Sequence, residues 1–147
     1  MASWTKICCP VDFSETSRAA LEEAAELARR YEAELALVHV FEPPAATADL
    51  MVAPPEMFEQ TAKDLERKLE LWKGEAERRG AKVVRAVVMT GAAATEAVRF
   101  AREGGYDLVV MGTHGRRGIR HLVLGSVAER VVREAPCAVL VVRPRAR

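Results

Sequence analysis

Short apolar runs alternate along this chain with longer stretches in which apolar residues recur at helical spacing. The short runs are continuous rather than alternating, which is typical of strands covered on both faces. Strands separated by helices predict a doubly wound parallel sheet, which places the chain in the α/β class. We expect strands over residues 6–11, 35–41, 82–89, 107–111 and 138–142, with helical patterns over 14–31, 58–76, 94–101 and 127–134.

The length and charge of the chain narrow the class of protein further. We find no internal repeat in the 147 residues, so residues 1–147 are expected to form a single domain with a substantial core. A net charge of +1 does not indicate a nucleic-acid partner. No apolar stretch approaches the roughly 20 residues that span a bilayer. The first residues lack the charged-then-apolar layout of a signal peptide, so we expect a cytoplasmic protein with no membrane partner.

The three cysteines are expected to be structural. Cys8 and Cys9 are adjacent on an expected strand, so their side chains should point to opposite faces and should not pair. Cys137 is expected to open the last strand. The chain has no C-x-x-C motif and no cysteine–histidine spacing typical of a metal site. These observations favour buried thiols over redox chemistry.

Four small residues near the end of the chain have a spacing that suits phosphate. After the strand expected at 107–111 come Gly112 and Gly115, then nine residues, then Gly125 and Ser126 at the start of the last helix. Glycines let the backbone approach an anion closely, and N–H groups at a helix N-terminus point toward it. The stretch is not a Walker A loop, because it has no lysine after its glycines. The alternative is that Gly125 and Ser126 form an ordinary helix start.

These motifs resemble those of a known family. Residues 110–115 and 124–127 closely resemble the nucleotide-binding signature of the universal stress proteins, in their ATP-binding subgroup. Residues 9–14, 37–40 and 136–143 resemble the first, second and last strands of that family. The resemblance implies a Rossmann-like, five-stranded sheet in the order 3-2-1-4-5 with helices on both faces. In that order the chain reverses direction between the first and fourth strands, where open α/β sheets bind ligands.

The resemblance also implies a set of binding residues. Asp12 would accept hydrogen bonds from ribose hydroxyls or help to hold Mg²⁺, although its spacing from Glu15 also fits a helix-capping carboxylate. Val40 would lie against adenine, and Met111 against the base, or both would fill the core. We expect no catalytic residue, and we interpret His114 as a packed or solvent-facing loop residue. The expected binding residues are Pro10, Asp12, Val40, Met111, Gly112, Thr113, Gly115, Gly125, Ser126 and Val127.

The predicted function is nucleotide sensing. The resemblance implies an adenine-nucleotide-binding protein, with ATP, ADP or AMP as ligand and Mg²⁺ accompanying it, that acts as a regulatory homodimer in the stress response. The apolar run 137–142 at a sheet edge would be an aggregation hazard unless a second copy pairs with it. Two alternatives stay open: a slow ATPase or phosphotransferase that uses the same site, and an interaction module that works without nucleotide. An unidentified protein partner is compatible with each.

Overall fold

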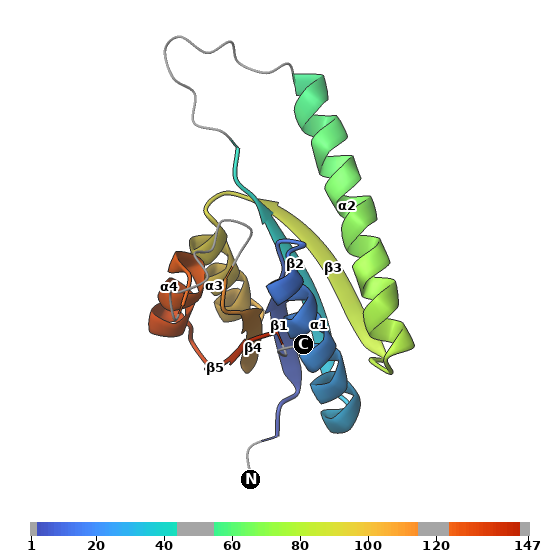
Figure 1. Cartoon of the computed structure of the whole chain (residues 1–147), viewed down its shortest axis with the longest axis vertical. Coiled ribbons are helices and arrows are strands. Elements are labelled where there is room, and N and C mark those ends of the chain that lie inside the picture. The colour runs from blue at the N-terminus through green and yellow to red at the C-terminus, as the bar shows by residue number, and fades with distance from the viewer. Residues whose placement is uncertain (1–2, 44–54, 115–123, 145–147) are drawn as a thin grey trace.

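The computed structural model describes residues 3–43, 55–114 and 124–144, in which strands and helices alternate (Figure 1). Each expected element is found there, with bounds that differ by a few residues at most. The strands are β1 (Lys6–Pro10), β2 (Glu34–Phe41), β3 (Val83–Thr90), β4 (Leu108–Gly112) and β5 (Ala138–Val142), and the helices are α1 (Glu15–Tyr31), α2 (Pro55–Arg78), α3 (Ala93–Glu103) and α4 (Ser126–Glu134).

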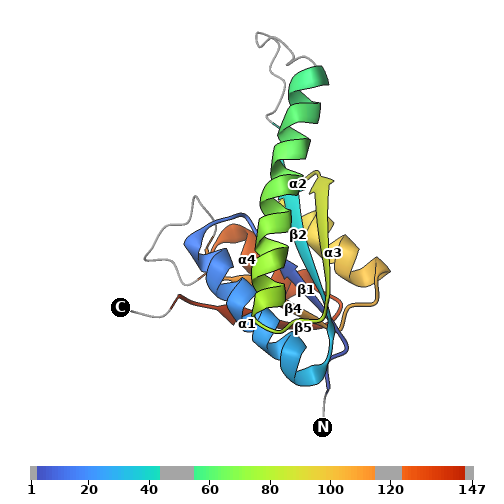
Figure 2. The ribbon, with the colours of Figure 1, turned by 90° about the vertical axis from the view of Figure 1, so that its right-hand side faces the viewer.

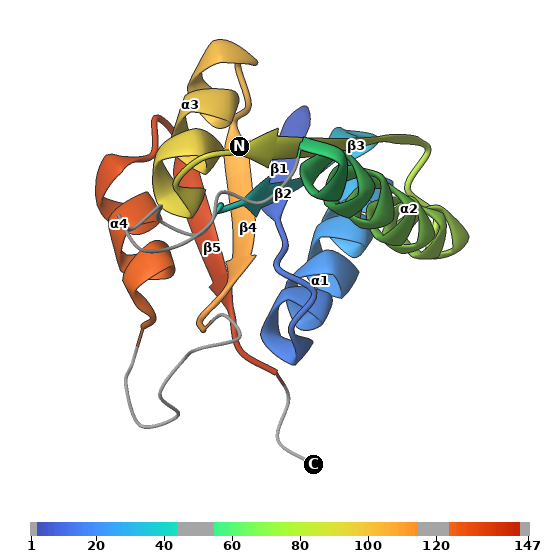
Figure 3. The same cartoon turned by 90° about the horizontal axis from the view of Figure 1, so that it is seen from above.

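The five strands form one parallel sheet in the order β3-β2-β1-β4-β5, which confirms the expected fold class. Parallel neighbours need a crossover connection, and the helices provide it. Seen from above, α1 and α2 cover one face of the sheet, and α3 and α4 cover the other (Figure 3). None of the helices within the described ranges is long and apolar enough to cross a membrane.

Two apolar cores lie on the two faces of the sheet, and the adjacent cysteines of β1 divide between them. Cys9 is buried in the core beneath α1 and α2, and Cys8 in the core beneath α3 and α4. Burial raises the pKa of both thiols, that of Cys9 to about 12, so both are protonated at neutral pH. The expectation of structural thiols on opposite faces is therefore confirmed. Cys137 is half-buried and precedes β5 by one residue instead of opening it.

The ends of the helices show which local signals the sequence carries. Ser14 is the N-cap of α1, as its residue type suggests, and its side chain accepts a hydrogen bond from the N–H of Ser17. Pro55 is the first residue of α2, a position that suits proline because its N–H would have no helical partner. Gly80 follows α2 with φ at 107°, a left-handed conformation that favours glycine.

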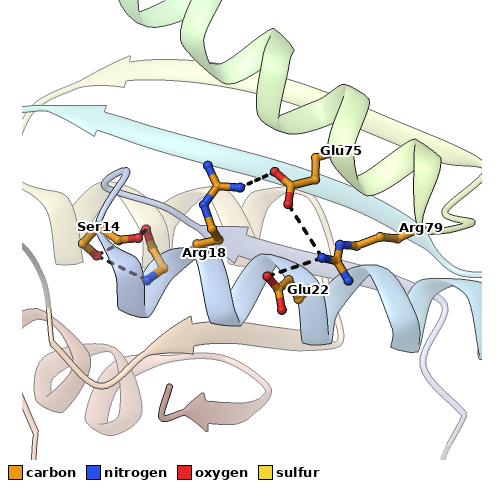
Figure 4. Close-up of polar contacts among 6 residues, drawn as sticks. Ser14, Arg18, Glu22, Glu75 and Arg79 are labelled. Carbon is orange, nitrogen blue, oxygen red and sulfur yellow. Dashed lines mark hydrogen bonds and ion pairs between the residues drawn. The ribbon is translucent and has the colours of Figure 1, made fainter. Parts of the chain in front are cut away.

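Charged side chains join the two helices on one face of the sheet (Figure 4). Arg18 of α1 is paired with Glu75 of α2, and its guanidinium group also lies 4.5 Å from the centre of the Trp72 ring. Arg79 lies 3.4 Å from Glu22 of α1 and 3.8 Å from Glu75. Exposed ion pairs contribute little individually, so these pairs add only modestly to the packing of α1 against α2. The N-terminal part of α2 extends beyond the end of the strands (Figure 2).

Candidate functional site

The middle of the sheet places the ends of β1 and β4 side by side. β1 pairs with β2 on one side and with β4 on the other, so the chain reverses its direction of winding at this point. Pro10 ends β1 and Gly112 ends β4. Both motifs that the sequence singles out therefore leave the sheet at its switch point, where open α/β sheets present a crevice.

The turn between β1 and α1 holds Asp12 through local hydrogen bonds. The Asp12 carboxylate accepts the N–H of Ser14 at 3.0 Å, and the Asp12 N–H donates to the Ser17 hydroxyl at 3.3 Å. The N-cap of α1 is Ser14, so the capping-box alternative for Asp12 and Glu15 is wrong in this form. The Asp12 carboxylate instead orients the turn that leads into the N-cap, as aspartate commonly does in Asx-turns.

Phe13 has an unusual backbone conformation within this turn. Its φ is 65°, a left-handed conformation that is unusual for a bulky side chain and costs on the order of 1–2 kcal/mol. Its ring lies 4.7 Å from His39 of β2 and 5.2 Å from Trp72 of α2, edge to face, with the Lys68 ammonium 4.6 Å from its centre. These contacts stabilise the strained conformation. No local sequence signal marks Phe13 for this role, because the partners that decide it come from two other elements.

Gly112 is required by close packing at the end of β4. A Cβ atom at this position would lie 2.8 Å from the backbone carbon and oxygen of Thr16, in the first turn of α1. Backbone atoms in a packed helix cannot move aside, so any side chain at residue 112 would separate β4 from α1. The glycine therefore has a structural role beside its predicted one at a phosphate.

The two ends of the glycine-rich segment meet directly. Thr113 is buried, its N–H donates to the Val142 carbonyl oxygen at 3.1 Å, and its own carbonyl oxygen accepts the N–H of Gly125 at 2.7 Å. Gly125 is the N-cap of α4 and offers no side-chain cap. The exit from β4 and the entry to α4 are thus held side by side. Gly115 and the basic residues after it lie outside the described residues.

The start of α4 is the candidate anion-binding element of the site. Ser126 is its first residue and Val127 its second, and the Val127 side chain is 38% exposed. The first N–H groups of an α-helix have no intrahelical acceptor and carry the positive end of the helix dipole. The helix start that the sequence analysis kept as an alternative is therefore real. It is also compatible with anion binding.

The predicted adenine contacts lie on the α3 and α4 face of the sheet. Met111 is only 5% exposed in that apolar core, and Val40 is half-buried against the same cluster. Met111 therefore fills the core, which is one of its two expected roles. Pro10 is half-buried at the end of β1. Contact of Val40 and Met111 with a base, and the role of Pro10 in the binding site, stay predictions.

A metal ion at this site would need most of its ligands from a bound molecule and from water. Among the described residues no three histidine, cysteine, aspartate or glutamate side chains are grouped to hold a metal ion. Mg²⁺ prefers six oxygen ligands and usually takes several from phosphate and water. A magnesium ion at Asp12 would therefore arrive with the nucleotide.

An open parallel sheet with a glycine-bearing exit beside its switch point defines a doubly wound, Rossmann-like α/β protein. Residues 3–143 match the universal stress protein family, and this chain belongs to that family. It is 33% identical over 147 residues to the universal stress protein MJ0531 of Methanocaldococcus jannaschii, an alignment that covers 95% of this chain and 82% of the relative.

Solved structures agree in fold. The universal stress protein UspA of Lactobacillus plantarum superposes with a TM-score of 0.82 at 25% identity, covering 97% of this chain and 100% of that one. A universal stress family protein of Arabidopsis thaliana, solved with AMP bound, has a TM-score of 0.69 at 21% identity, covering 97% and 93% of the two chains. The resemblance stated from the sequence is confirmed at the level of family and fold.

Proposed function

We propose that this protein binds an adenine nucleotide, with ATP as the foremost ligand, where β1 and β4 leave the sheet. The single observation that carries the proposal is the hydrogen bond between Thr113 and Gly125, which brings a glycine-bearing strand exit against a helix N-terminus. That pairing is suited to phosphate, because it places the first N–H groups of α4 and the positive end of its helix dipole beside the strand exit. The Arabidopsis family member with AMP bound supports an adenine nucleotide by analogy.

In this proposal each part of the nucleotide has its own contacts. Asp12 accepts hydrogen bonds from the ribose, and Val40, Pro10 and Met111 border the adenine. Gly112, Thr113 and Gly115 approach the phosphates from β4, while Gly125, Ser126 and Val127 approach them from α4. Alternatively, Asp12 would help to hold an Mg²⁺ ion that accompanies the phosphates. Residues 112–126 contain no lysine, so we propose binding rather than rapid turnover.

We also propose that the protein works as a cytoplasmic homodimer whose surface changes when nucleotide is bound. β5 ends the sheet order and pairs with β4 on one side. Its Leu140 side chain is 37% exposed. A second copy that pairs edge to edge with β5 would satisfy the backbone groups of this strand through a two-fold interface. Such a dimer would place two nucleotide sites in one regulatory protein of the stress response.

Native mass spectrometry with Mg-ATP tests the binding proposal. We expect one ATP per subunit in the unmodified protein and none in Gly125→Val, because a branched side chain would cover the start of α4. Gly74→Val is the matched control, since Gly74 lies in α2, away from the site, and a Cβ there meets only the flexible end of Arg78. Absence of ATP from the unmodified protein at millimolar nucleotide would favour the nucleotide-independent module.

A further inference from the structure

The side chain of Thr16 joins the two halves of the candidate site. Thr16 lies in the first turn of α1, four residues after Asp12. Its hydroxyl donates a hydrogen bond to the carbonyl oxygen of His114, 98 positions away, two residues past the end of β4. Its backbone also forms the surface that excludes a side chain at Gly112. One residue of α1 therefore contacts the exit from β4 in two independent ways.

The direction of the hydrogen bonds follows from the chemistry of the groups. A carbonyl oxygen only accepts, so the one hydroxyl proton of Thr16 goes to His114. The Ser14 hydroxyl lies 3.1 Å from that of Thr16 and 3.4 Å from that of Ser17, and its single proton can be donated to either oxygen. The Ser14 N–H in turn donates to the Asp12 carboxylate at 3.0 Å. A continuous polar chain therefore runs from Asp12 to the backbone of the glycine-rich segment.

The chain continues on the side of β4. The His114 ring nitrogen Nδ1 lies 3.0 Å from the Thr113 hydroxyl, and the Thr113 carbonyl oxygen accepts the N–H of Gly125. His114 is bonded directly to Thr113 in the chain, so a shift of the His114 backbone also displaces Thr113 and its contact with Gly125. A change at Thr16 is therefore expected to reach the start of α4.

We propose that Thr16 is a positioning residue of the nucleotide site, whose hydroxyl holds the first peptides after β4 in register with the Asp12 turn. This inference rests on the proposed function and adds a residue to it. Thr16 belongs to α1 and acts on the segment proposed to bind phosphate, whereas Val40 and Met111 lie in the core on the opposite face of the sheet (Figure 3). Loss of the Thr16 hydroxyl should therefore weaken ligands that carry phosphates and leave adenosine unaffected.

The first arm of the test needs no nucleotide. Hydrogen exchange of the Thr113 and Gly125 amides is compared in the unmodified protein, Thr16→Val and Thr16→Ser. Valine keeps the shape and removes the hydroxyl, whereas serine keeps the hydroxyl. We expect exchange about three- to tenfold faster in Thr16→Val, the range for one lost hydrogen bond, and ordinary rates in Thr16→Ser.

The matched control is Thr5→Val at the opposite end of the strands. The Thr5 hydroxyl donates to Asp107 at 2.8 Å, so this variant also loses a hydroxyl contact between distant segments. It should leave exchange at Thr113 and Gly125 unchanged. Unchanged exchange in Thr16→Val, or equal acceleration in Thr5→Val, would overturn the positioning role whether or not the protein binds ATP.

The second arm compares affinities by calorimetry. Thr16→Val should weaken ATP about three- to tenfold and adenosine by less than twofold, with Thr16→Ser close to the unmodified protein. Equal weakening of both ligands would mean a general structural effect and would contradict the proposal. An unmodified protein that binds neither ligand overturns the proposed function instead. The exchange data then decide alone whether Thr16 positions the segment.

Discussion

At the scale of single residues, Asp107 shows how one carboxylate can join two strands. It precedes β4 and accepts hydrogen bonds from the Thr5 N–H and hydroxyl and from the Lys6 N–H at the start of β1. Burial alone would raise the pKa of Asp107, but the hydrogen bonds from Thr5 and Lys6 hold it below the ordinary value. A depressed folded-state pKa means that the carboxylate stabilises the folded protein above the unfolded pKa. This contribution is lost as the pH falls through the folded-state pKa.

We therefore predict that Asp107→Asn lowers the free energy of unfolding by about 1–3 kcal/mol at pH 7, because the amide places a donor against backbone donors. The difference between variant and unmodified protein should shrink below about pH 4, where the unfolded-state carboxyl becomes protonated. Urea unfolding at pH 7 and pH 3 measures this difference in the free energy of unfolding. Asp64→Asn on the exposed face of α2 is the control, and a gap that does not depend on pH would contradict the prediction.

Sequence reasoning at this scale succeeded where the partner is local. The opposed cysteines follow from neighbours in the chain and were predicted, and the N-cap role of Ser14 also agrees with its residue type. The left-handed Phe13 and the hydroxyl of Thr16 were missed, because their partners Trp72 and His114 lie far away in sequence. The contact between Thr113 and Gly125, two residues of the expected binding set, was not predicted and comes from the structure. Their contact with a ligand stays a prediction.

At the scale of elements, the N-terminus of α3 is capped by a side chain from another segment of the chain. Its N-cap residue, Ala92, has no side-chain acceptor, and the Glu42 carboxylate after β2 accepts the Ala93 N–H at 2.7 Å instead. A carboxylate at a helix N-terminus is stabilised by the helix dipole as well as by the hydrogen bond. The hydrophobic pattern predicted the helix itself, but it carries no information about a cap 51 positions away.

A new capping side chain at Ala92 should compensate for loss of the Glu42 cap. Glu42→Ala is expected to cost about 1 kcal/mol of stability, a typical value for a lost N-cap. Ala92 has extended backbone angles that suit an N-cap aspartate. Ala92→Asp should therefore recover most of that loss in the Glu42→Ala background and gain less in the unmodified protein. Thermal unfolding of the four proteins gives the coupling, and strictly additive effects would show that Glu42 does not cap α3.

At the scale of the whole molecule, the sheet order puts β3 and β5 at its two edges. Continuous apolar runs predicted the parallel class, and the family resemblance supplied the strand order. Composition and periodicity could not have provided that order, because they do not say which strands become neighbours. They also could not place the first turn of α1 against Gly112, which depends on how both elements pack on the finished sheet.

The proposed dimer gives a prediction at this scale. We expect the unmodified protein to sediment at twice the chain mass of 16.2 kDa, and Leu140→Asp to sediment as a monomer, because like charges would meet across a two-fold β5 edge. Leu71→Asp is the matched control, since Leu71 is 73% exposed on α2, an element apart from β5. Analytical ultracentrifugation distinguishes the forms. A Leu140→Asp dimer, or a Leu71→Asp monomer, would place the interface elsewhere.

The hydrogen bond from Thr113 to Val142 has a consequence for synthesis on the ribosome. All the residues predicted to bind nucleotide precede residue 128, yet the strand that holds Thr113 in place comes afterwards. Val142 is added to the growing chain roughly 130 residues after Asp12. At ordinary elongation rates this delay is about 10 s. A nascent chain arrested before residue 138 would carry every predicted binding residue and still lack the edge strand that anchors Thr113.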